Sequence, residues 1–311
     1  MKILFFDDFK LGVLNGDQII DVTGLVTDIP MAGPHDLVNG LIENFDTYRD
    51  RLEEAAASGT GVPLDSVRIR APLPRPVNIV CMAVNYMEDG TLPEPAPINA
   101  FTKASNSVIG PGDTMVLQDI PATVFEGEAE LGVVIGKRCY QVSQEDAMDY
   151  VFGYINFIDG SARGLPPPAN FFFQMKARES FTPIGPYLVT KDEIDDPQKV
   201  PVKLWVNGNL LQNFNTDDMA HSIKRCIEWI SHVHALEPGD IIATGTNHGG
   251  LNPFHDGDVV ELECEGMGKL SINIQDDLKR TWERTTRLER KNKGLEPPHA
   301  PQLSGKYAPV K

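Results

Sequence analysis

The chain has 311 residues, of which 41% are hydrophobic and 23% charged, as in a globular protein with one main domain and a smaller one. Its net charge of −16 argues against nucleic acid or an anionic membrane as a partner. The four cysteines form no CxxC pair, and the first apolar run ends at once in Asp7 and Asp8. Such a run is too short for a signal peptide, and no other run could span a bilayer, so we expect a soluble, cytoplasmic protein with reduced thiols.

The first part of the chain predicts a small α+β domain. Two short apolar segments flank Asn15-Gly16, a pair that tolerates the positive φ of a hairpin turn. Residues 36–57 then carry apolar side chains at helical spacing, with acids outside them. Alternating prolines begin at Pro72 and exclude a helix, so they indicate a linker. We therefore place an N-terminal domain at residues 1–72.

Strands dominate the remainder of the chain. The one substantial helix is expected at residues 218–233, after a cap at Thr216 or Asp217. Because helices are few and do not alternate regularly with strands, the sequence predicts an α+β fold. The main domain would cover residues 73–278, followed by a proline-rich tail at 279–311. The expected strands include residues 77–83, 128–135, 201–206, 259–264 and 270–274.

Three acids stand out in this strand-rich part. Glu128 and Glu130 lie two apart in a predicted strand, so their side chains share one face. Asp159 ends another apolar run. Hard oxygen ligands that converge from two strands are what Mg²⁺, Mn²⁺ or Ca²⁺ requires. The alternative is an exposed strand edge where both glutamates face water, and the spacing alone favours neither reading.

A series of short stretches carries a family resemblance over roughly residues 77–274. The stretches include Asn85-Tyr86, Phe101-Thr102-Lys103, Glu128-Ala129-Glu130-Leu131, Asp159-Gly160-Ser161-Ala162-Arg163, Lys176, Thr182-Pro183-Ile184-Gly185-Pro186 and Gly245-Thr246. In this order they resemble the fumarylacetoacetate hydrolase family. The resemblance implies a mixed β-sandwich roll, usually a homodimer, and one divalent cation at Glu128, Glu130 and Asp159. Mg²⁺ or Mn²⁺ is expected there, with Ca²⁺ as a further hard cation.

The resemblance also implies the substrate class and several site residues. Members of the family act on small 2-oxo or β-diketo acids, as hydrolases of acylpyruvates, decarboxylases or keto–enol isomerases. By the match, Lys176 and Arg163 would hold a carboxylate or a developing oxyanion. Thr246 and Tyr86 would contact the substrate. The cation and these two basic side chains would make a positive pocket in an acidic protein.

The chain departs from the family pattern at the base that activates water. Hydrolytic members carry a His after the Asn-Tyr pair, whereas Asp89 stands there in this chain. The candidate bases are therefore Glu88, Asp89 and His248. Hydrolysis of a C–C bond is the leading prediction, and decarboxylation or keto–enol isomerisation is the alternative because neither needs activated water. A third possibility is a catalytically silent protein that binds an oxo acid.

Two further expectations concern the distal group and the tail. Phe171, Phe172 and Phe173 favour a large or aromatic distal group on the substrate, or else a place in the core. The tail after Lys279 is too polar to form a core of its own, so we expect it to pack on folded surface of a homodimer.

Overall fold

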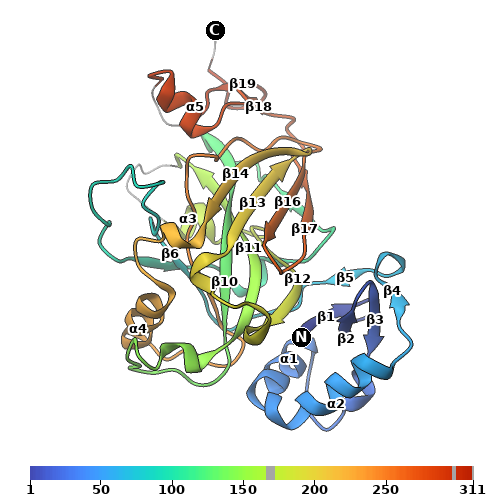
Figure 1. The fold of residues 1–311 in the computed structure, drawn as a ribbon. Helices are drawn as coiled ribbons and strands as arrows, with labels where there is room; N and C mark the ends of the chain where they lie inside the picture. The colour runs from blue at the N-terminus through green and yellow to red at the C-terminus, as the bar shows by residue number, and fades with distance from the viewer. Residues whose placement is uncertain (166–171, 296–298, 310–311) are drawn as a thin grey trace.

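The computed structural model describes residues 1–165, 172–295 and 299–309. Figure 1 shows a strand-rich main body, with the N-terminal segment against one side and the C-terminal segment at the top. Strands predominate and helices are few, so the predicted α+β class is confirmed. None of the helices in the described ranges has the length and apolar character needed to cross a bilayer.

One large sheet runs through the N-terminal segment and the main body. Its strands lie in the order β4-β3-β2-β1-β12-β11-β10-β15-β6-β7, with β5 paired to β1 and β8 to β12. Lys2 and Ile3 of β1 pair with Val189 and Leu188 of β12, so the two parts share backbone hydrogen bonds. The shared sheet does not test the predicted boundary between two domains at residue 72, which stays a prediction. The strands are β1 (Lys2–Phe6), β2 (Lys10–Asn15), β3 (Gln18–Asp21), β4 (Val62–Pro63), β5 (Ile69–Arg70), β6 (Ile79–Met82), β7 (Ala100–Thr102), β8 (Val108–Ile109), β10 (Val124–Ile135), β11 (Val151–Arg163), β12 (Thr182–Thr190) and β15 (Ile241–Ala243).

A second sheet packs against the long central strands β10 and β11. Its order is β14-β13-β16-β17-β9, and its members are β14 (Asn209–Asn215), β13 (Pro201–Val206), β16 (Val259–Cys264), β17 (Leu270–Gln275) and β9 (Thr114–Val116). Because successive side chains of β10 point to opposite faces of the sheet, the strand contributes to two hydrophobic cores. Leu131 and Val133 belong to the core shared with the second sheet, and Val134 belongs to the core shared with the N-terminal helices. β10 is therefore buried along its whole length.

The helices begin and end differently from the prediction. The expected helix at 36–57 is two helices, α1 (Pro34–Glu43) and α2 (Phe45–Ser58), because the chain leaves helical geometry at Asn44. The expected helix at 218–233 is α4 (Ile223–Val233), because the Ser222 side chain accepts from the Arg225 N–H and caps it there. Thr216–Asp218 is a separate 3-10 helix, capped by Asn215. The remaining α-helices of the described ranges are α3 (Phe172–Lys176) and α5 (Arg287–Asn292).

The tail packs on its own chain. Trp282 is 1% exposed, and its indole donates to the Thr123 carbonyl over 2.6 Å. The buried Arg280 guanidinium donates to the carbonyls of Leu117 and Ile120. Beyond these anchors the tail forms β18 (Thr281–Trp282), α5 and β19 (Gln302–Ser304), which lie at the top of the molecule in Figure 1. The expectation that the tail lies on folded surface is thus met within one chain.

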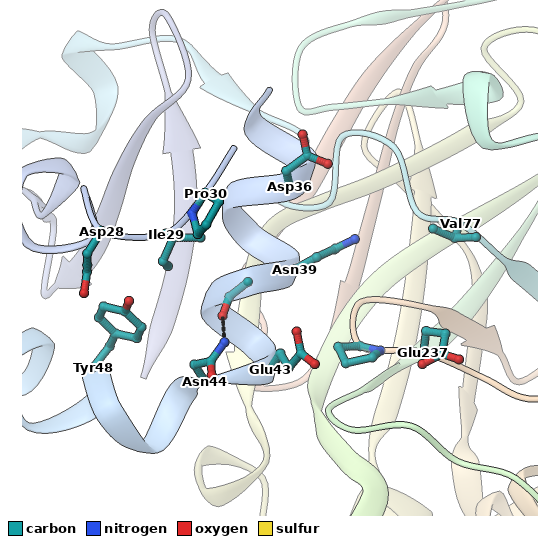
Figure 2. A pocket seen from close by; sticks show the side chains of 12 residues that line it. Asp28, Ile29, Pro30, Asp36, Asn39, Glu43, Asn44, Tyr48, Val77 and Glu237 are labelled. Atoms are coloured by element: carbon teal, nitrogen blue, oxygen red, sulfur yellow. Dashed lines mark hydrogen bonds between the residues drawn. The ribbon is translucent and has the colours of Figure 1, made fainter. Parts of the chain in front are cut away.

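A cavity of about 640 Å³ lies where α1 and α2 face the main body (Figure 2). Asp28, Asp36, Glu43 and Glu237 line it, together with Asn44, whose side chain donates to the Gly40 carbonyl. Among the residues that line this cavity there is no Lys or Arg. An anionic substrate would be repelled there, so the chemistry must be sought elsewhere.

Candidate metal and substrate site

The three predicted acids converge on the central strands. Glu128 and Glu130 lie on β10, and Asp159 lies on β11 directly opposite Glu128 in the antiparallel register. Directly opposed residues of an antiparallel pair point to the same face. One carboxylate oxygen from each acid lies within 4.8 Å of the other two. Their exposed fractions are 6%, 1% and 0%, so the alternative of a solvated strand edge is excluded.

Three basic side chains surround this carboxylate triad. Lys176, at the end of α3, donates from Nζ to Glu128 Oε2 over 2.8 Å and to Asp159 Oδ2 over 2.5 Å. Arg163, at the end of β11, bonds Glu128. Lys103 donates from Nζ to Asp159 Oδ1 over 2.5 Å and to the Lys176 carbonyl over 2.7 Å. Lys176 and Arg163, both predicted as site residues, thus contact the triad directly.

Lys103 was not predicted as a site residue. It is 5% exposed, and a lysine is almost never fully buried without a partner of opposite charge. The sequence feature that could have predicted Lys103 is its place in the Phe101-Thr102-Lys103 stretch, which carries the family resemblance. In the structure it lies directly after β7. Its side chain bonds one oxygen of the Asp159 carboxylate while Lys176 bonds the other, so each Asp159 oxygen has its own ammonium group.

The pKa values of the two glutamates move in opposite directions. Burial alone would raise the pKa of Glu128, but the charges of Lys176 and Arg163 outweigh it and hold that pKa well below its ordinary value. Burial, reinforced by the negative charges of Asp159 and Glu128, raises the pKa of Glu130 well above its ordinary value. Oε1 of Glu130 is buried with no hydrogen-bond partner in the described part of the chain. A buried, partnerless oxygen among hard oxygen donors fits a divalent cation.

A third glutamate on the same face of β10 was also missed. Glu126 is 2% exposed and accepts from Arg163 Nε over 3.1 Å and from Arg287 Nη2 over 2.6 Å. Burial would raise the pKa of Glu126, but the two guanidinium charges hold it below its ordinary value. The sequence feature that could have predicted Glu126 is the repeat of Glu at every second position of the strand. Through Glu126, the tail helix α5 is linked to Arg163 and so to the triad.

A loop after β15 runs from the triad towards the candidate bases. The Gly245 N–H, at a φ of +89°, donates to Glu130 Oε2 over 2.7 Å. Gln212 accepts from the Ala129 N–H and donates to Thr246 Oγ1 and to the Asn247 carbonyl, both over 2.8 Å. These bonds tie the loop to β10. Because His248 follows Gly245 by three residues, their Cα atoms are at most about 11 Å apart.

Two of the three candidate bases contact each other. His248 Nδ1 lies 2.5 Å from Glu88 Oε1, and the His248 N–H donates to Glu88 Oε2 over 3.0 Å. A carboxylate can only accept here, so Nδ1 carries a proton, and in the neutral form of the ring Nε2 holds the lone pair. Within the described ranges Nε2 has no hydrogen-bond partner. We call Glu88 and His248 the dyad.

The other predicted contacts are placed differently. Asp89 is exposed and has its backbone N–H bonded to Asp218, so it is not part of the dyad. Tyr86 is 0% exposed and packs edge-on against Phe214, and its buried hydroxyl has no hydrogen-bond partner in the described part of the chain, so its contact with substrate stays a prediction. Phe172 stacks on Phe101 beside Lys176, and Phe173 is exposed, while Phe171 lies outside the described residues.

The dyad lines a cavity of about 460 Å³. One wall comes from the segment after Tyr86 and from the loop that carries His248. The other wall comes from the tail. The lining residues are Glu88, Asp89, Thr91, Leu92, Asn247, His248, Gly249, Arg287, Leu288, Lys291, Gly294 and Leu295.

Comparison with known proteins agrees with this fold. Residues 78–275 match the family model described as "Fumarylacetoacetate (FAA) hydrolase C-terminal". The chain therefore belongs to the fumarylacetoacetate hydrolase family, as the resemblance predicted. The chain is 33% identical over 291 residues to maleylpyruvate hydrolase of Aquipseudomonas alcaligenes, with 88% of this chain and 99% of that protein covered. It is 37% identical over 225 residues to oxaloacetate tautomerase YisK of Bacillus subtilis (strain 168), with coverages of 68% and 74%.

A solved structure is also similar to this chain in both fold and sequence. Maleylpyruvate hydrolase from Sphingobium sp. SYK-6, in complex with manganese (II) ion and pyruvate, matches with a TM-score of 0.81 and 36% identity. The match covers 89% of this chain and 99% of that one. These relatives are named as a hydrolase and a tautomerase, so the prediction of an enzyme of the hydrolase, lyase or isomerase kind is confirmed.

Proposed function

We propose that this chain is a divalent-metal-dependent hydrolase that cleaves the C–C bond of an acylpyruvate. The observation that carries the proposal is the dyad of Glu88 and His248, tied by one short loop to the carboxylate triad. Hydrolysis needs a place that binds the 2-oxo acid and a base that activates water, and the triad and the dyad would supply these two parts. The similarity to two maleylpyruvate hydrolases supports this choice.

Glu128, Glu130 and Asp159 are the residues that would hold Mg²⁺ or Mn²⁺, and the cation would supply Lewis-acid polarisation of the 2-oxo carbonyl. Lys176 and Arg163 add the positive charge that draws in the substrate carboxylate and stabilises negative charge as it develops. Thr246, held by Gln212, would donate its hydroxyl to that carboxylate.

The dyad supplies the proton transfers. His248 Nε2 takes a proton from water, and Glu88 stabilises the imidazolium that forms. The resulting hydroxide adds to the acyl carbon, and the bond between that carbon and the neighbouring methylene breaks. Its electron pair stays on the pyruvate part, which takes the proton back from His248. One acylpyruvate and one water thus give pyruvate and one carboxylic acid.

Keto–enol tautomerisation of a small oxo diacid is the second candidate. The 37% identity to an oxaloacetate tautomerase favours it. This reaction needs no activated water, because the dyad would only move a proton between the carbon next to the carbonyl and the enol oxygen. The products distinguish hydrolysis and tautomerisation from the two other possibilities. Decarboxylation releases CO₂, and silent binding of an oxo acid gives no product.

The test follows products with Mn²⁺ or Mg²⁺ present. Acetylpyruvate should give pyruvate and acetate, and His248→Gln should lower the rate by about 10² or more if the imidazole is the base. His232→Gln, at an exposed position of α4, is the matched control and should leave the rate unchanged. Tautomerisation of oxaloacetate without cleavage of acetylpyruvate would favour the second candidate. CO₂ release would favour decarboxylation, and no turnover of either acid would overturn both proposals.

A further inference from the structure

A series of ion pairs connects the tail to the carboxylate triad. Arg287 donates from Nη2 to Glu126 Oε2 over 2.6 Å, and Arg163 donates from Nε to the same oxygen over 3.1 Å. Nη2 of Arg163 in turn bonds Glu128, one of the three acids of the triad. The family match ends at residue 275, so Arg287 lies outside the matched region. Three ion pairs in series therefore join a tail residue to a predicted cation ligand.

The fold fixes Arg287 at the start of α5. Its N–H donates to the Leu251 carbonyl over 3.1 Å, and the next N–H of the helix, from Leu288, donates to the Gly249 carbonyl over 2.8 Å. Thr286 caps the helix in a capping box. The backbone on both sides of Arg287 is thus bonded, and its side chain is only 19% exposed. The guanidinium is therefore held beside β10 instead of moving freely in solvent.

The buried charge of Glu126 requires a partner from the tail. Glu126 is 2% exposed, and a buried carboxylate is costly unless cations match it. Arg163 and Arg287 bond it directly. His299 also interacts with Glu126, but burial lowers the pKa of His299 to about 4, so that ring is neutral at pH 7. Among the described residues of the tail, Arg287 is therefore the cation that matches Glu126.

Glu126 and Glu128 compete for Arg163. With Arg287 present, these two glutamates and two arginines carry no net charge. Without Arg287, Glu126 would have to draw its positive charge from Arg163. Glu128 would still have Lys176, whose Nζ lies 2.8 Å from Glu128 Oε2. The Arg163 guanidinium would then turn from Glu128 towards both oxygens of Glu126, because a bidentate pair of arginine and carboxylate is stronger than a single bond.

We propose that Arg287 is a positioning residue, which neutralises the buried Glu126 and so keeps the Arg163 guanidinium beside Glu128, where it can receive the carboxylate of the substrate. The tail would in this way set the affinity for the 2-oxo acid through Arg163. This inference rests on the proposed function, which assigns Arg163 to the substrate carboxylate. It adds a determinant of binding from outside the matched family region.

Binding of pyruvate to the protein loaded with Mn²⁺ tests this role without turnover. Calorimetry would give two Kd values for each variant, one for Mn²⁺ and one for pyruvate. Arg287→Met should raise the Kd for pyruvate by about fivefold or more, as expected when a charge-assisted hydrogen bond is lost. The Kd for Mn²⁺ should not rise, because loss of a positive charge leaves the surroundings of the triad more negative. General damage to the site would instead weaken the binding of both.

Two further variants separate positioning from a purely structural role. Glu126→Gln removes the charge that competes for Arg163, so its combination with Arg287→Met should return the Kd for pyruvate to within about twofold of the wild type. Arg287→Lys keeps the charge but loses the planar fork, so it should raise this Kd less than Arg287→Met does. Lys293→Met is the matched control, since Lys293 is exposed at the end of α5. It should leave both Kd values unchanged.

The outcomes separate this inference from the proposed function. If Arg163→Met weakens the binding of pyruvate but Arg287→Met does not, the positioning role is wrong while the function stands. The same holds if the folded double variant keeps the high Kd, or if Arg287→Lys raises it as much as Arg287→Met does. If the wild type with Mn²⁺ fails to bind pyruvate, or if Arg163→Met leaves the Kd unchanged, the proposed function fails in its assignment of Arg163, and the positioning role fails with it.

Discussion

Removing Arg287 should loosen the tail and destabilise the protein. The Arg287 guanidinium lies 2.6 Å from Glu126 Oε2, where Glu126 is 2% exposed and the arginine side chain is 19% exposed. Breaking a fully buried ion pair costs about 3–5 kcal/mol because one charge is left unpaired. Arg163 remains beside Glu126, and Arg287 is partly solvated. We therefore expect Arg287→Met to lower the free energy of unfolding by about 2–3 kcal/mol.

Urea unfolding of a double-mutant cycle measures this pair directly. The cycle combines Arg287→Met with Glu126→Gln, and the coupling energy should be about 1–3 kcal/mol. Lys293→Met is the control and should stay within about 0.5 kcal/mol of the wild type. A coupling energy below about 0.5 kcal/mol would show that the ion pair does not hold the tail.

Three further predictions concern the metal, pH and the oligomer. Glu130→Ala should abolish tight binding of Mn²⁺ in a calorimetric titration while the circular dichroism spectrum stays that of a folded protein; unchanged affinity would exclude Glu130 as a ligand. Burial, with Arg287 nearby, lowers the pKa of His299 to about 4. As pH falls, His299 of the unfolded chain therefore binds a proton before His299 of the folded chain does. The stabilisation that neutral His299 gives the folded chain is complete above about pH 6.5 and is lost as pH falls towards 4. The difference in Tm between wild type and His299→Gln should change in that window, and a constant difference would contradict the assignment. The wild type should elute from a sizing column as a dimer, and deletion from Lys291 onward should lower its Tm; a monomeric elution volume would refute the dimer.

Local patterns predicted the strands better than the helix ends. The turn at Asn15-Gly16 and the strand Val259–Cys264 follow from residue types that are decisive within a few positions. The start of α4 did not follow, because Thr216, Asp217 and Ser222 can all cap a helix. Which of them does so depends on the tertiary fold, in which Gln198 also accepts from the Ile223 N–H.

The site was predictable where its residues share a strand or a motif. Glu128 and Glu130 face the same way because strand side chains alternate. Asp159 stood out because it ends an apolar run, and the family resemblance assigned it to the same cation. The dyad was not predictable as a pair. Glu88 and His248 are 160 positions apart in the sequence. Each was a candidate base separately, but only the fold places one beside the other.

The burial of β10 between two hydrogen-bonded neighbours determines which parts of the site can open to solvent. The amide protons through which this strand bonds β11 should exchange with solvent only when the whole molecule unfolds, since β11 pairs with β10 along its length and β15 covers the other edge at residues 132–134. The dyad instead lies on two loops, one of which holds Glu88 and Asp89 at positive φ. Such segments open locally at a small cost in free energy. Replacement of these loops could therefore redirect the chemistry of this scaffold while its cation ligands keep their positions.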